Sequence, residues 1–205
     1  MPVRVKICGI TSANDALDAV AAGADALGFM FHESSPRYIT FEIAADIISR
    51  LPPFVARVGV FVNPNASLVH KAIECGIDIL QFHGDEPPEF CRQFNHKFIK
   101  AFRVRDSGFL ESCTHYPDAA WLLDSFVPGQ MGGTGQTFNW ELAAVAAQKH
   151  PFVILAGGLT PENVATAIQK THPYAVDVSS GVEVAPGRKS RALMEQFIRA
   201  AKSAS

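Results

Sequence analysis

A thiol and a carboxyl group stand at the ends of two apolar segments that are far apart in the chain. Cys8 ends the segment Val3 to Cys8, and Asp124 ends the segment Ala119 to Asp124. If both segments are strands of one closed parallel sheet, their carboxyl ends meet at one face and the two groups can face each other across a ligand. A thiolate takes a proton and a carboxylic acid gives one, so this pair predicts general acid–base chemistry.

Two glycine-containing segments follow the last two apolar segments, and we expect them to bind a phosphate. Gly157 and Gly158 come first, and Ser180 and Gly181 follow later. Glycines let the backbone approach a phosphate closely, and N–H groups at a following helix start donate to it without a cationic side chain. The glycine pair by itself is also typical of a tight turn before a helix. Together, the two segments favour a phosphate site.

Three further polar side chains are candidates for substrate binding. Arg37 follows a proline in a loop, and its guanidinium could bind a carboxylate with two parallel hydrogen bonds, although a solvated surface arginine is commoner. His83 directly follows one apolar segment and Asp177 is the next-to-last residue of another, and strand alternation directs both toward the inside of a barrel. A glycine-rich stretch at 128–135 is expected to move over a bound ligand.

Each of these residues also has a structural interpretation when it is taken singly. Cys8 could be a small buried hydrophobe, Asp124 a turn cap and His83 a satisfied histidine of the barrel wall. Lys6 and Asp177 could form a structural ion pair. The convergence of ionisable groups on one end of the predicted sheet favours a functional interpretation.

Eight apolar segments are predicted strands, and helical segments follow them, several beginning at capping residues such as Ser12, Thr40 and Ser190. The strands are Val3–Cys8, Ala24–Met30, Phe54–Val62, Ile77–Phe82, Lys97–Phe102, Ala119–Asp124, Phe152–Ala156 and Ala175–Val178. Eight units in 205 residues leave about 25 residues each, close to the minimum for a (β/α)8 barrel. We predict an α/β fold, a single (β/α)8 TIM-barrel domain over residues 1–205 with eight parallel strands. A doubly wound open sheet is the alternative.

Strand alternation also predicts which side chains of the first strand lie beside Cys8 inside the barrel. It turns Val3, Val5 and Ile7 toward the helices and leaves Lys6 and Cys8 facing the barrel axis. A free thiol titrates at about 8.5, so a cysteine needs help to act as a base. We therefore expect Lys6 to favour the thiolate form of Cys8.

The composition argues against several kinds of partner. Eighteen Lys and Arg stand against 20 Asp and Glu, giving a formal charge of −2, and the basic residues are scattered; we expect no nucleic-acid partner. No uncharged apolar run reaches about 18 residues, and the first residues do not form a targeting segment. We expect a cytoplasmic protein, without membrane contact, that binds a small phosphorylated molecule. The spacing of the four cysteines predicts neither a disulfide nor a metal site, and we expect no cofactor. The cysteines are Cys8, Cys75, Cys91 and Cys113.

Several motifs resemble the phosphoribosylanthranilate isomerase family over nearly the whole chain. They are V-K-I-C-G-I-T at 5–11, S-P-R-Y-I at 35–39, V-G-V-F-V-N at 58–63, F-H-G-D at 82–85, L-L-D-S at 122–125, G-G-T-G-Q-T-F-N-W at 132–140, L-A-G-G-L-T-P-E-N-V at 155–164 and V-D-V-S-S-G-V-E at 176–183. The resemblance implies a cofactor-free Amadori rearrangement in tryptophan biosynthesis. It implies that Cys8 is the general base, that Asp124 is the general acid and that Arg37 binds the anthranilate carboxylate. We expect the chain to be a monomer or a homodimer.

Three other functions remain as alternatives. The related isomerase family of histidine biosynthesis acts on another phosphoribosyl aminoaldose. That family looks as though it uses two aspartates for acid–base catalysis, whereas this chain has Cys8 at the first of the two positions. A non-catalytic barrel that binds a phosphorylated ligand would not need Cys8 opposite Asp124. A cysteine nucleophile would need a nearby base and an oxyanion hole, and no motif supplies both.

Overall fold

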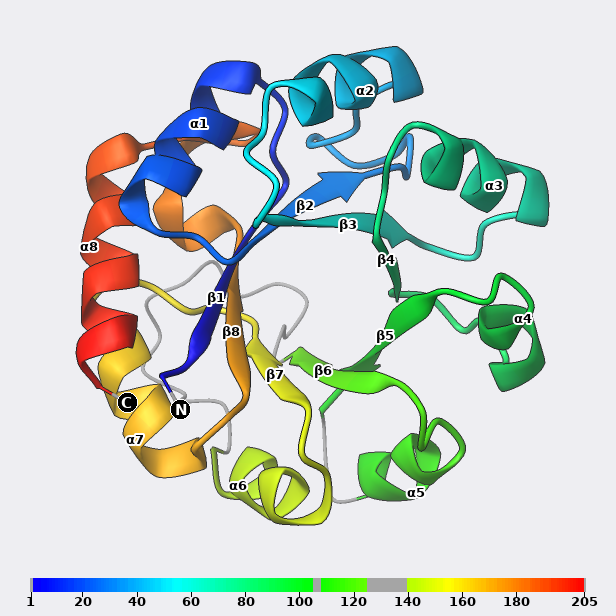
Figure 1. Ribbon diagram of the computed structural model, residues 1–205. Coiled ribbons are helices and arrows are strands. Elements are labelled where there is room, and N and C mark those ends of the chain that lie inside the picture. The colour runs from blue at the N-terminus through cyan, green and yellow to red at the C-terminus, as the bar shows by residue number, and fades with distance from the viewer. Residues whose placement is uncertain (1, 105–107, 125–139, 205) are drawn as a thin grey trace.

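Eight parallel strands form a closed barrel in the computed structural model, which describes residues 2–104, 108–124 and 140–204. The strands are β1 (Arg4–Cys8), β2 (Ala26–Met30), β3 (Ala56–Phe61), β4 (Ile79–Phe82), β5 (Lys97–Arg103), β6 (Ala120–Asp124), β7 (Val153–Ala156) and β8 (Ala175–Val178). Each pairs with the next, and β1 closes the ring by pairing with β8 (Figure 1). The predicted eight-stranded parallel barrel is confirmed.

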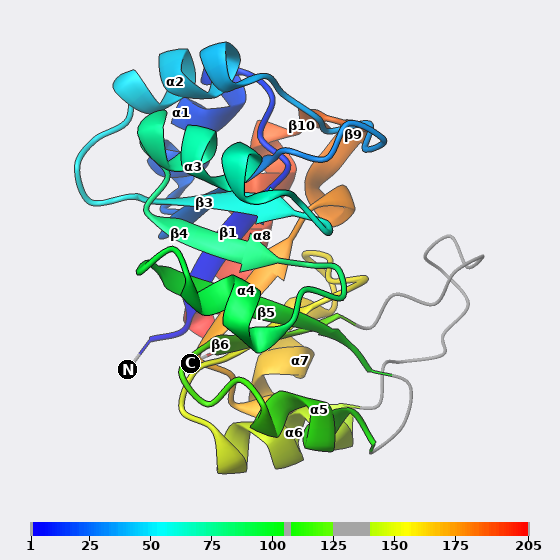
Figure 2. The ribbon, with the colours of Figure 1, turned by 90° about the vertical axis from the view of Figure 1, so that its right-hand side faces the viewer.

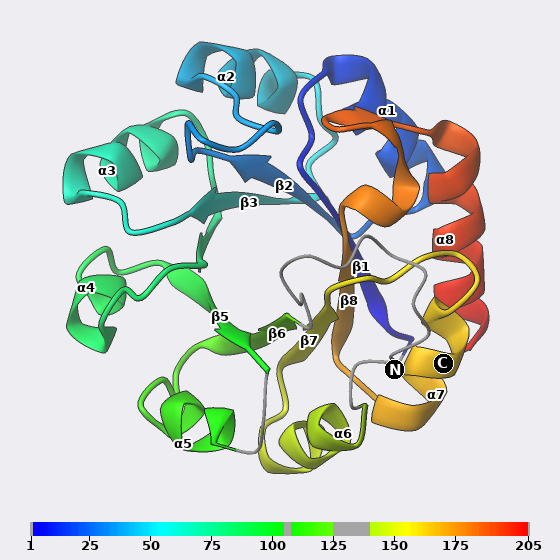
Figure 3. The same ribbon diagram turned by 180° about the vertical axis from the view of Figure 1, so that it is seen from behind.

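Helices alternate with the strands and form an outer ring around them (Figures 1 and 3). They are α1 (Ala13–Ala22), α2 (Phe41–Ser49), α3 (Ala66–Glu74), α4 (Pro88–Arg92), α5 (Phe109–Thr114), α6 (Trp140–Lys149), α7 (Val164–Thr171) and α8 (Arg191–Ser203). The helices α1, α2 and α8 begin at the predicted caps Ser12, Thr40 and Ser190. The side-chain oxygen of each cap accepts a backbone N–H of the first turn, which would otherwise lack a partner.

The barrel has two apolar layers. Side chains between the strands and the helices form the larger core, which includes Val5 and Ile7 with no exposed surface. Inside the barrel a smaller cluster contains Val58, Ile99, Ala101, Leu122, Ile154, Ala156 and Ala175. This interior cluster fills the space beneath the mouth, so the barrel is a packed scaffold and not a channel.

A short ribbon follows β8 on the face where the strands end. It consists of a 3-10 turn, η1 (Ser180–Val182), and two antiparallel strands, β9 (Glu183–Ala185) and β10 (Arg188–Lys189). Figure 2 shows the barrel from the side, with β9 and β10 beyond the carboxyl ends of the strands. This ribbon is not predictable from the sequence, because its strands are two and three residues long and carry no alternating apolar pattern.

Most predicted strand boundaries were one or two residues too long at the amino-terminal end, while β5 was one residue too short. Phe54 was assigned to a strand, but it is 96% exposed and β3 begins at Ala56. In the other direction, β5 continues to Arg103, which pairs with Asp124 of β6. Apolar character alone does not mark where pairing with the neighbouring strand begins or ends.

Candidate active site

Cys8 lies at the carboxyl end of β1 beside Lys6, and both side chains are buried in the barrel mouth. The strand β2 provides the space for them, because a Cβ added to Gly28 would lie 2.8 Å from Cys8 Sγ and 3.1 Å from Lys6 Nζ. Gly28 was not among the predicted site residues. Gly28 could have been identified from the sequence as a glycine within a predicted strand that neighbours the strand of the candidate base.

Burial raises the pKa of Cys8 above its ordinary value, and the neighbouring charges only partly oppose this. Lys6 lowers the pKa of the thiol by attraction and by hydrogen bonding, whereas Asp177 raises it. The expected influence of Lys6 is therefore present, but burial outweighs it. Burial therefore favours the thiol form of Cys8 over the thiolate.

Lys6 is held by Asp177, which stands near the end of β8. Lys6 Nζ lies 2.9 Å from Asp177 Oδ1, and the two side chains are 4% and 8% exposed. Burial works against the positive charge on Lys6, but Asp177 and Cys8 outweigh burial and raise the pKa of Lys6. The structure thus places Asp177 as the partner of Lys6, and its expected contact with a substrate stays a prediction.

Asp124 lies at the end of β6 and contacts His83, which directly follows β4. His83 Nε2 lies 3.1 Å from Asp124 Oδ2, and the side chains are 25% and 19% exposed. The other ring nitrogen, His83 Nδ1, lies 3.0 Å from Nε2 of Gln81, an inward residue of β4. Both predicted residues therefore reach the mouth and meet there. Gln81 is an additional residue of the site that was not predicted from the sequence.

Arg37 lies above the end of β1, but one edge of its guanidinium is already engaged. Its Nε lies 2.8 Å from Oε1 of Glu183 and its Nη2 lies 2.6 Å from Oε2. A Cβ added to Gly9 would lie 2.5 Å from Arg37 Cδ, so the side chain crosses directly over the loop after β1. This contact places Arg37 close to Cys8 in space.

Glu183 is the buried centre of this part of the site, at 4% side-chain exposure. Lys189 Nζ lies 2.7 Å from Oε1 of Glu183 and donates to the carbonyl oxygen of Ser179. Burial alone would raise the pKa of Glu183, but hydrogen bonds from Arg37 and Lys189 lower it. Burial lowers the pKa of Lys189 and outweighs the effect of Glu183. The ribbon β9–β10 therefore fixes the position of Arg37.

The two predicted phosphate segments lie against each other. A Cβ added to Gly181 would lie 2.0 Å from the carbonyl oxygen of Leu159, so these two loops are in direct backbone contact. Gly157 and Gly158 both have positive φ, and a Cβ on Gly158 would meet nothing within 4 Å, so this loop borders open space. The helix α7 begins at Val164, and residues 161–163 form a turn before it.

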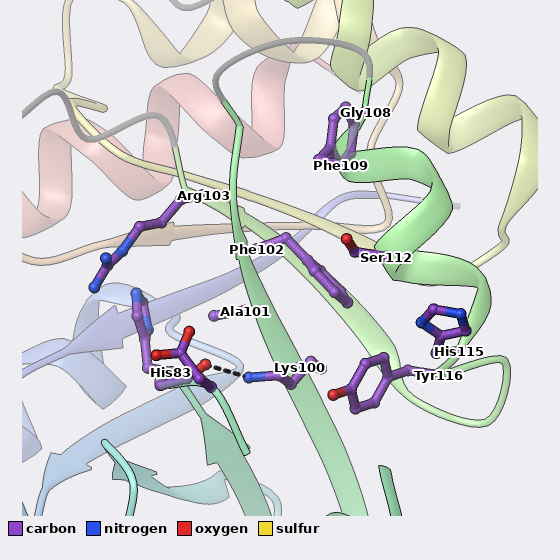
Figure 4. A pocket seen from close by; sticks show the side chains of 12 residues that line it. His83, Lys100, Ala101, Phe102, Arg103, Gly108, Phe109, Ser112, His115 and Tyr116 are labelled. Atoms are coloured by element: carbon purple, nitrogen blue, oxygen red, sulfur yellow. Dashed lines mark hydrogen bonds between the residues drawn. The ribbon is translucent and has the colours of Figure 1, made fainter. Parts of the chain in front are cut away.

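A pocket of about 450 Å³ opens beside His83, between the ends of β4 and β5 and the helix α5 (Figure 4). Its wall includes Phe102, Phe109 and Tyr116, with Arg103 at its rim. Strand alternation directs Arg103 to the same side as Ala101, toward the mouth. Arg103 was missed because the predicted strand ended at Phe102.

Among the described residues, no helix is long and apolar enough to cross a membrane, and no group of three His, Cys, Asp or Glu side chains could hold a metal ion. The four cysteines are free thiols. The glycine-rich stretch at 128–135, which was expected to move over a ligand, lies outside the described residues.

Comparison with known proteins gives one consistent result. The family described as N-(5'phosphoribosyl)anthranilate (PRA) isomerase matches residues 5–200. Proteins named N-(5'-phosphoribosyl)anthranilate isomerase from Geobacter metallireducens and Geobacter sulfurreducens are each 59% identical to this chain. The first match covers 98% of this chain and 100% of the relative, and the second covers 98% of each.

Solved structures agree with the sequence comparison. The phosphoribosyl anthranilate isomerase from Thermotoga maritima is 45% identical, with a TM-score of 0.93 over 98% of this chain and 99% of that one. A phosphoribosyl anthranilate isomerase in complex with reduced 1-(o-carboxyphenylamino)-1-deoxyribulose 5-phosphate is 43% identical, with a TM-score of 0.89 over the same shares. With its closed barrel and a matching family over 5–200, this chain belongs to the N-(5'-phosphoribosyl)anthranilate isomerase family.

Proposed function

We propose that Cys8 and Asp124 are the general base and general acid with which this chain isomerises N-(5'-phosphoribosyl)anthranilate to 1-(2-carboxyphenylamino)-1-deoxyribulose 5-phosphate, a step of tryptophan biosynthesis. The observation that carries the proposal is their placement. The two residues end β1 and β6, and β7 and β8 lie between these strands on one side of the closed barrel. A ligand held over the mouth can therefore meet a base on one side and an acid on the other.

The reaction requires only proton transfers, because the aminoaldose and the aminoketose contain the same atoms. A proton from Asp124 to the furanose ring oxygen lets the bond between that oxygen and C1 break, which leaves a protonated imine. Removal of the C2 proton by Cys8 then gives an enolamine, which tautomerises to the ketone. Asp124 must therefore carry a proton when the substrate binds, and Cys8 must be able to lose one.

Lys6 supplies the charge that makes the second requirement attainable. Burial disfavours the Cys8 thiolate, and Lys6 is the neighbour that opposes burial most strongly. Asp177 in turn keeps Lys6 charged and directed at the mouth through the 2.9 Å ion pair. We assign Lys6 to thiolate stabilisation, and we propose that Asp177 holds Lys6 in place and also contacts the substrate.

Arg37 is proposed to bind the anthranilate carboxylate with the edge that Glu183 leaves available. Glu183 occupies Nε and one hydrogen of Nη2. A guanidinium has five N–H donors, so Nη1 and the second hydrogen of Nη2 form another edge that suits a carboxylate. The bidentate contact with a carboxylate that the sequence predicts would therefore be made by Nη1 and Nη2, at the end of the Arg37 side chain.

We assign the phosphate to the loop after β7 and to the 3-10 turn η1, which follows β8. The backbone contact between these loops brings Gly157 and Gly158 near Ser180 and Gly181, and positive φ values at the first two make them places where the backbone can approach an anion. His83, beside Asp124, is proposed to contact the sugar where the acid acts.

We further propose that residues 1–205 act as one isomerase domain in the cytoplasm, as a monomer or homodimer, on a small phosphorylated substrate and without a nucleic-acid partner. A solved relative carries a reduced ribulose phosphate derivative, which supports the ligand class. Another solved relative is described as monomers generated from a dimeric enzyme of Thermotoga maritima, which is compatible with either state.

Turnover of freshly made N-(5'-phosphoribosyl)anthranilate, followed by the loss of its fluorescence, tests the assigned activity. The phosphoribosyl aminoaldose of histidine biosynthesis is assayed in parallel, and binding of the reduced product analogue is measured by calorimetry. We expect turnover of the first substrate and inhibition by the analogue. Binding of the analogue without turnover would favour the non-catalytic binder, and turnover of the second substrate alone would favour the histidine-pathway enzyme.

A further inference from the structure

A carboxamide lies where the interior of the barrel is otherwise apolar. Gln81 of β4 faces the axis and is 1% exposed. Its partners in register are Val60 of β3 and Ile99 of β5, both buried. Packing alone would be served by an apolar side chain of similar volume, because a polar group in such surroundings costs free energy unless all its atoms are hydrogen-bonded.

The amide of Gln81 is only partly satisfied. Its Nε2 lies 3.0 Å from His83 Nδ1, while its Oε1 has no hydrogen-bond partner in the described part of the chain. The reverse orientation of the amide would leave the NH2 group without an acceptor, and unpaired buried N–H groups are rarer in proteins than unpaired carbonyl oxygens. The amide therefore presents its NH2 group to His83.

This orientation determines which nitrogen of His83 carries hydrogen. An NH2 group only donates, so Nδ1 must accept and the ring hydrogen resides on Nε2. His83 Nε2 then donates to Asp124 Oδ2, which is 3.1 Å away. Three side chains from β4, from the residue after it and from β6 thus form one directed chain of hydrogen bonds.

We propose that Gln81 is a positioning residue for proton donation by Asp124: it holds His83 neutral with hydrogen on Nε2, which makes Oδ2 an acceptor and leaves the transferable proton on Oδ1. The proposal rests on the assigned role of Asp124 as the acid. It explains why the interior keeps a glutamine with an unpaired oxygen. It also gives His83 a task besides contact with the substrate, namely to set which oxygen of the carboxyl group is protonated.

The hydrogen positions of His83 are measured directly by long-range ¹⁵N–¹H correlation spectra of the histidine-labelled full chain, with the His83→Asn variant identifying the signal. The proposal predicts a parent spectrum with Nδ1 unprotonated and Nε2 protonated. This readout does not depend on turnover, so it separates failure of the tautomer assignment from failure of the proposed acid. A parent His83 with hydrogen on Nδ1, or on both nitrogens, would overturn the proposal.

Gln81→Met removes the donor and keeps the side-chain length. We expect kcat to fall about tenfold with little change in KM, the size of one neutral hydrogen bond, and thermal stability to stay the same or rise. Ile99→Met is the matched control in the neighbouring strand and should retain parent activity and the parent His83 signal. Full activity of Gln81→Met would contradict the proposal.

A double-mutant comparison tests whether Gln81 acts through His83. In the His83→Asn background, Gln81→Met should cause no further loss of kcat, because the ring that it positions is gone. An equal tenfold loss in both backgrounds would assign Gln81 a role of its own and overturn the proposal. If Gln81→Met does not fold, the parent spectrum still decides the question.

Discussion

Glu183 binds Arg37 along one edge of its guanidinium, with Nε 2.8 Å from Oε1 and Nη2 2.6 Å from Oε2. The contact joins the ribbon after β8 to the loop after β2, two segments that are 146 residues apart in the chain. It fixes the plane of Arg37 before a ligand arrives, so less rotational freedom is lost on binding.

Replacement of Glu183 should therefore weaken substrate binding more than it slows the reaction. We expect Glu183→Gln to raise KM about tenfold, since one charge-assisted contact is lost, with kcat within about threefold of the parent. Glu195→Gln is the control, because Glu195 pairs with Arg191 on the surface of α8. A variant with an unchanged KM would show that Arg37 does not depend on Glu183.

Two substitutions should move the titration of Cys8 in opposite directions. Lys6→Met removes the cation that lowers the pKa of Cys8, so alkylation of that thiol should require higher pH. Asp177→Asn removes an anion that raises the pKa, so the alkylation profile should shift to lower pH. Mass spectrometry of the Cys8 peptide after timed reaction with iodoacetamide measures both shifts, with Cys75 as an internal control. Shifts of the same sign would be inconsistent with direct electrostatic action.

The raised pKa of Cys8 also has a consequence for catalysis. A base that is mostly protonated at neutral pH becomes more effective as pH rises, so kcat/KM should still be increasing at about pH 8. The profile is recorded over the range in which circular dichroism shows the fold unchanged. A profile that is already flat from about pH 6 upward would mean that the base is a preformed thiolate or another group.

Much of this arrangement was predictable because strand alternation is a strict rule. Once β1 was recognised, Lys6 and Cys8 had to face inward, and the same rule brought His83 and Asp124 to one mouth. The ion pair of Lys6 with Asp177 was one of the interpretations open from the sequence. The glycine segments could be proposed as a phosphate site because barrel enzymes often bind phosphate after their last two strands, and this assignment stays a prediction.

Other features depended on information that the sequence does not hold locally. The contact between Arg37 and Glu183 depends on a ribbon whose strands are too short for periodicity to detect. The protonation of Cys8 depends on how deeply the thiol is buried, and the sequence indicated only the opposing cation. Gln81 was not among the predicted site residues, and its bond to His83 could be seen only once the side chains were placed.

The contacts of Asp25 affect the stability of the fold. Asp25, just before β2, accepts hydrogen bonds from Val5 N at 2.8 Å and Lys202 Nζ at 2.7 Å, and also pairs with Arg4. Burial alone would raise the pKa of Asp25, but these partners lower it. A lowered carboxyl pKa stabilises the fold above the unfolded-state value of about 3.9, and this contribution is lost as pH falls through the folded-state value.

Asp25→Asn should therefore lower the free energy of unfolding by about 1 kcal/mol at neutral pH, the typical size of such a hydrogen-bonded contact. Urea denaturation at neutral pH and at about pH 3 measures the difference, which should shrink at the lower pH. Asp46→Asn, which alters an exposed i,i+4 pair with Arg50, is the control and should change stability little. An equal loss at both pH values would rule out an ionic origin.

The proposed acid–base pair is tested most directly by the turnover of N-(5'-phosphoribosyl)anthranilate by Cys8→Ser and Asp124→Asn, beside the controls Cys75→Ser and Asp46→Asn. We expect the first two variants to keep the fold of the parent and each to lose at least about a hundredfold in kcat, the lower range for a general acid or base. The two controls should retain parent turnover. Retention of parent kcat by either Cys8→Ser or Asp124→Asn would contradict the assignment of this pair.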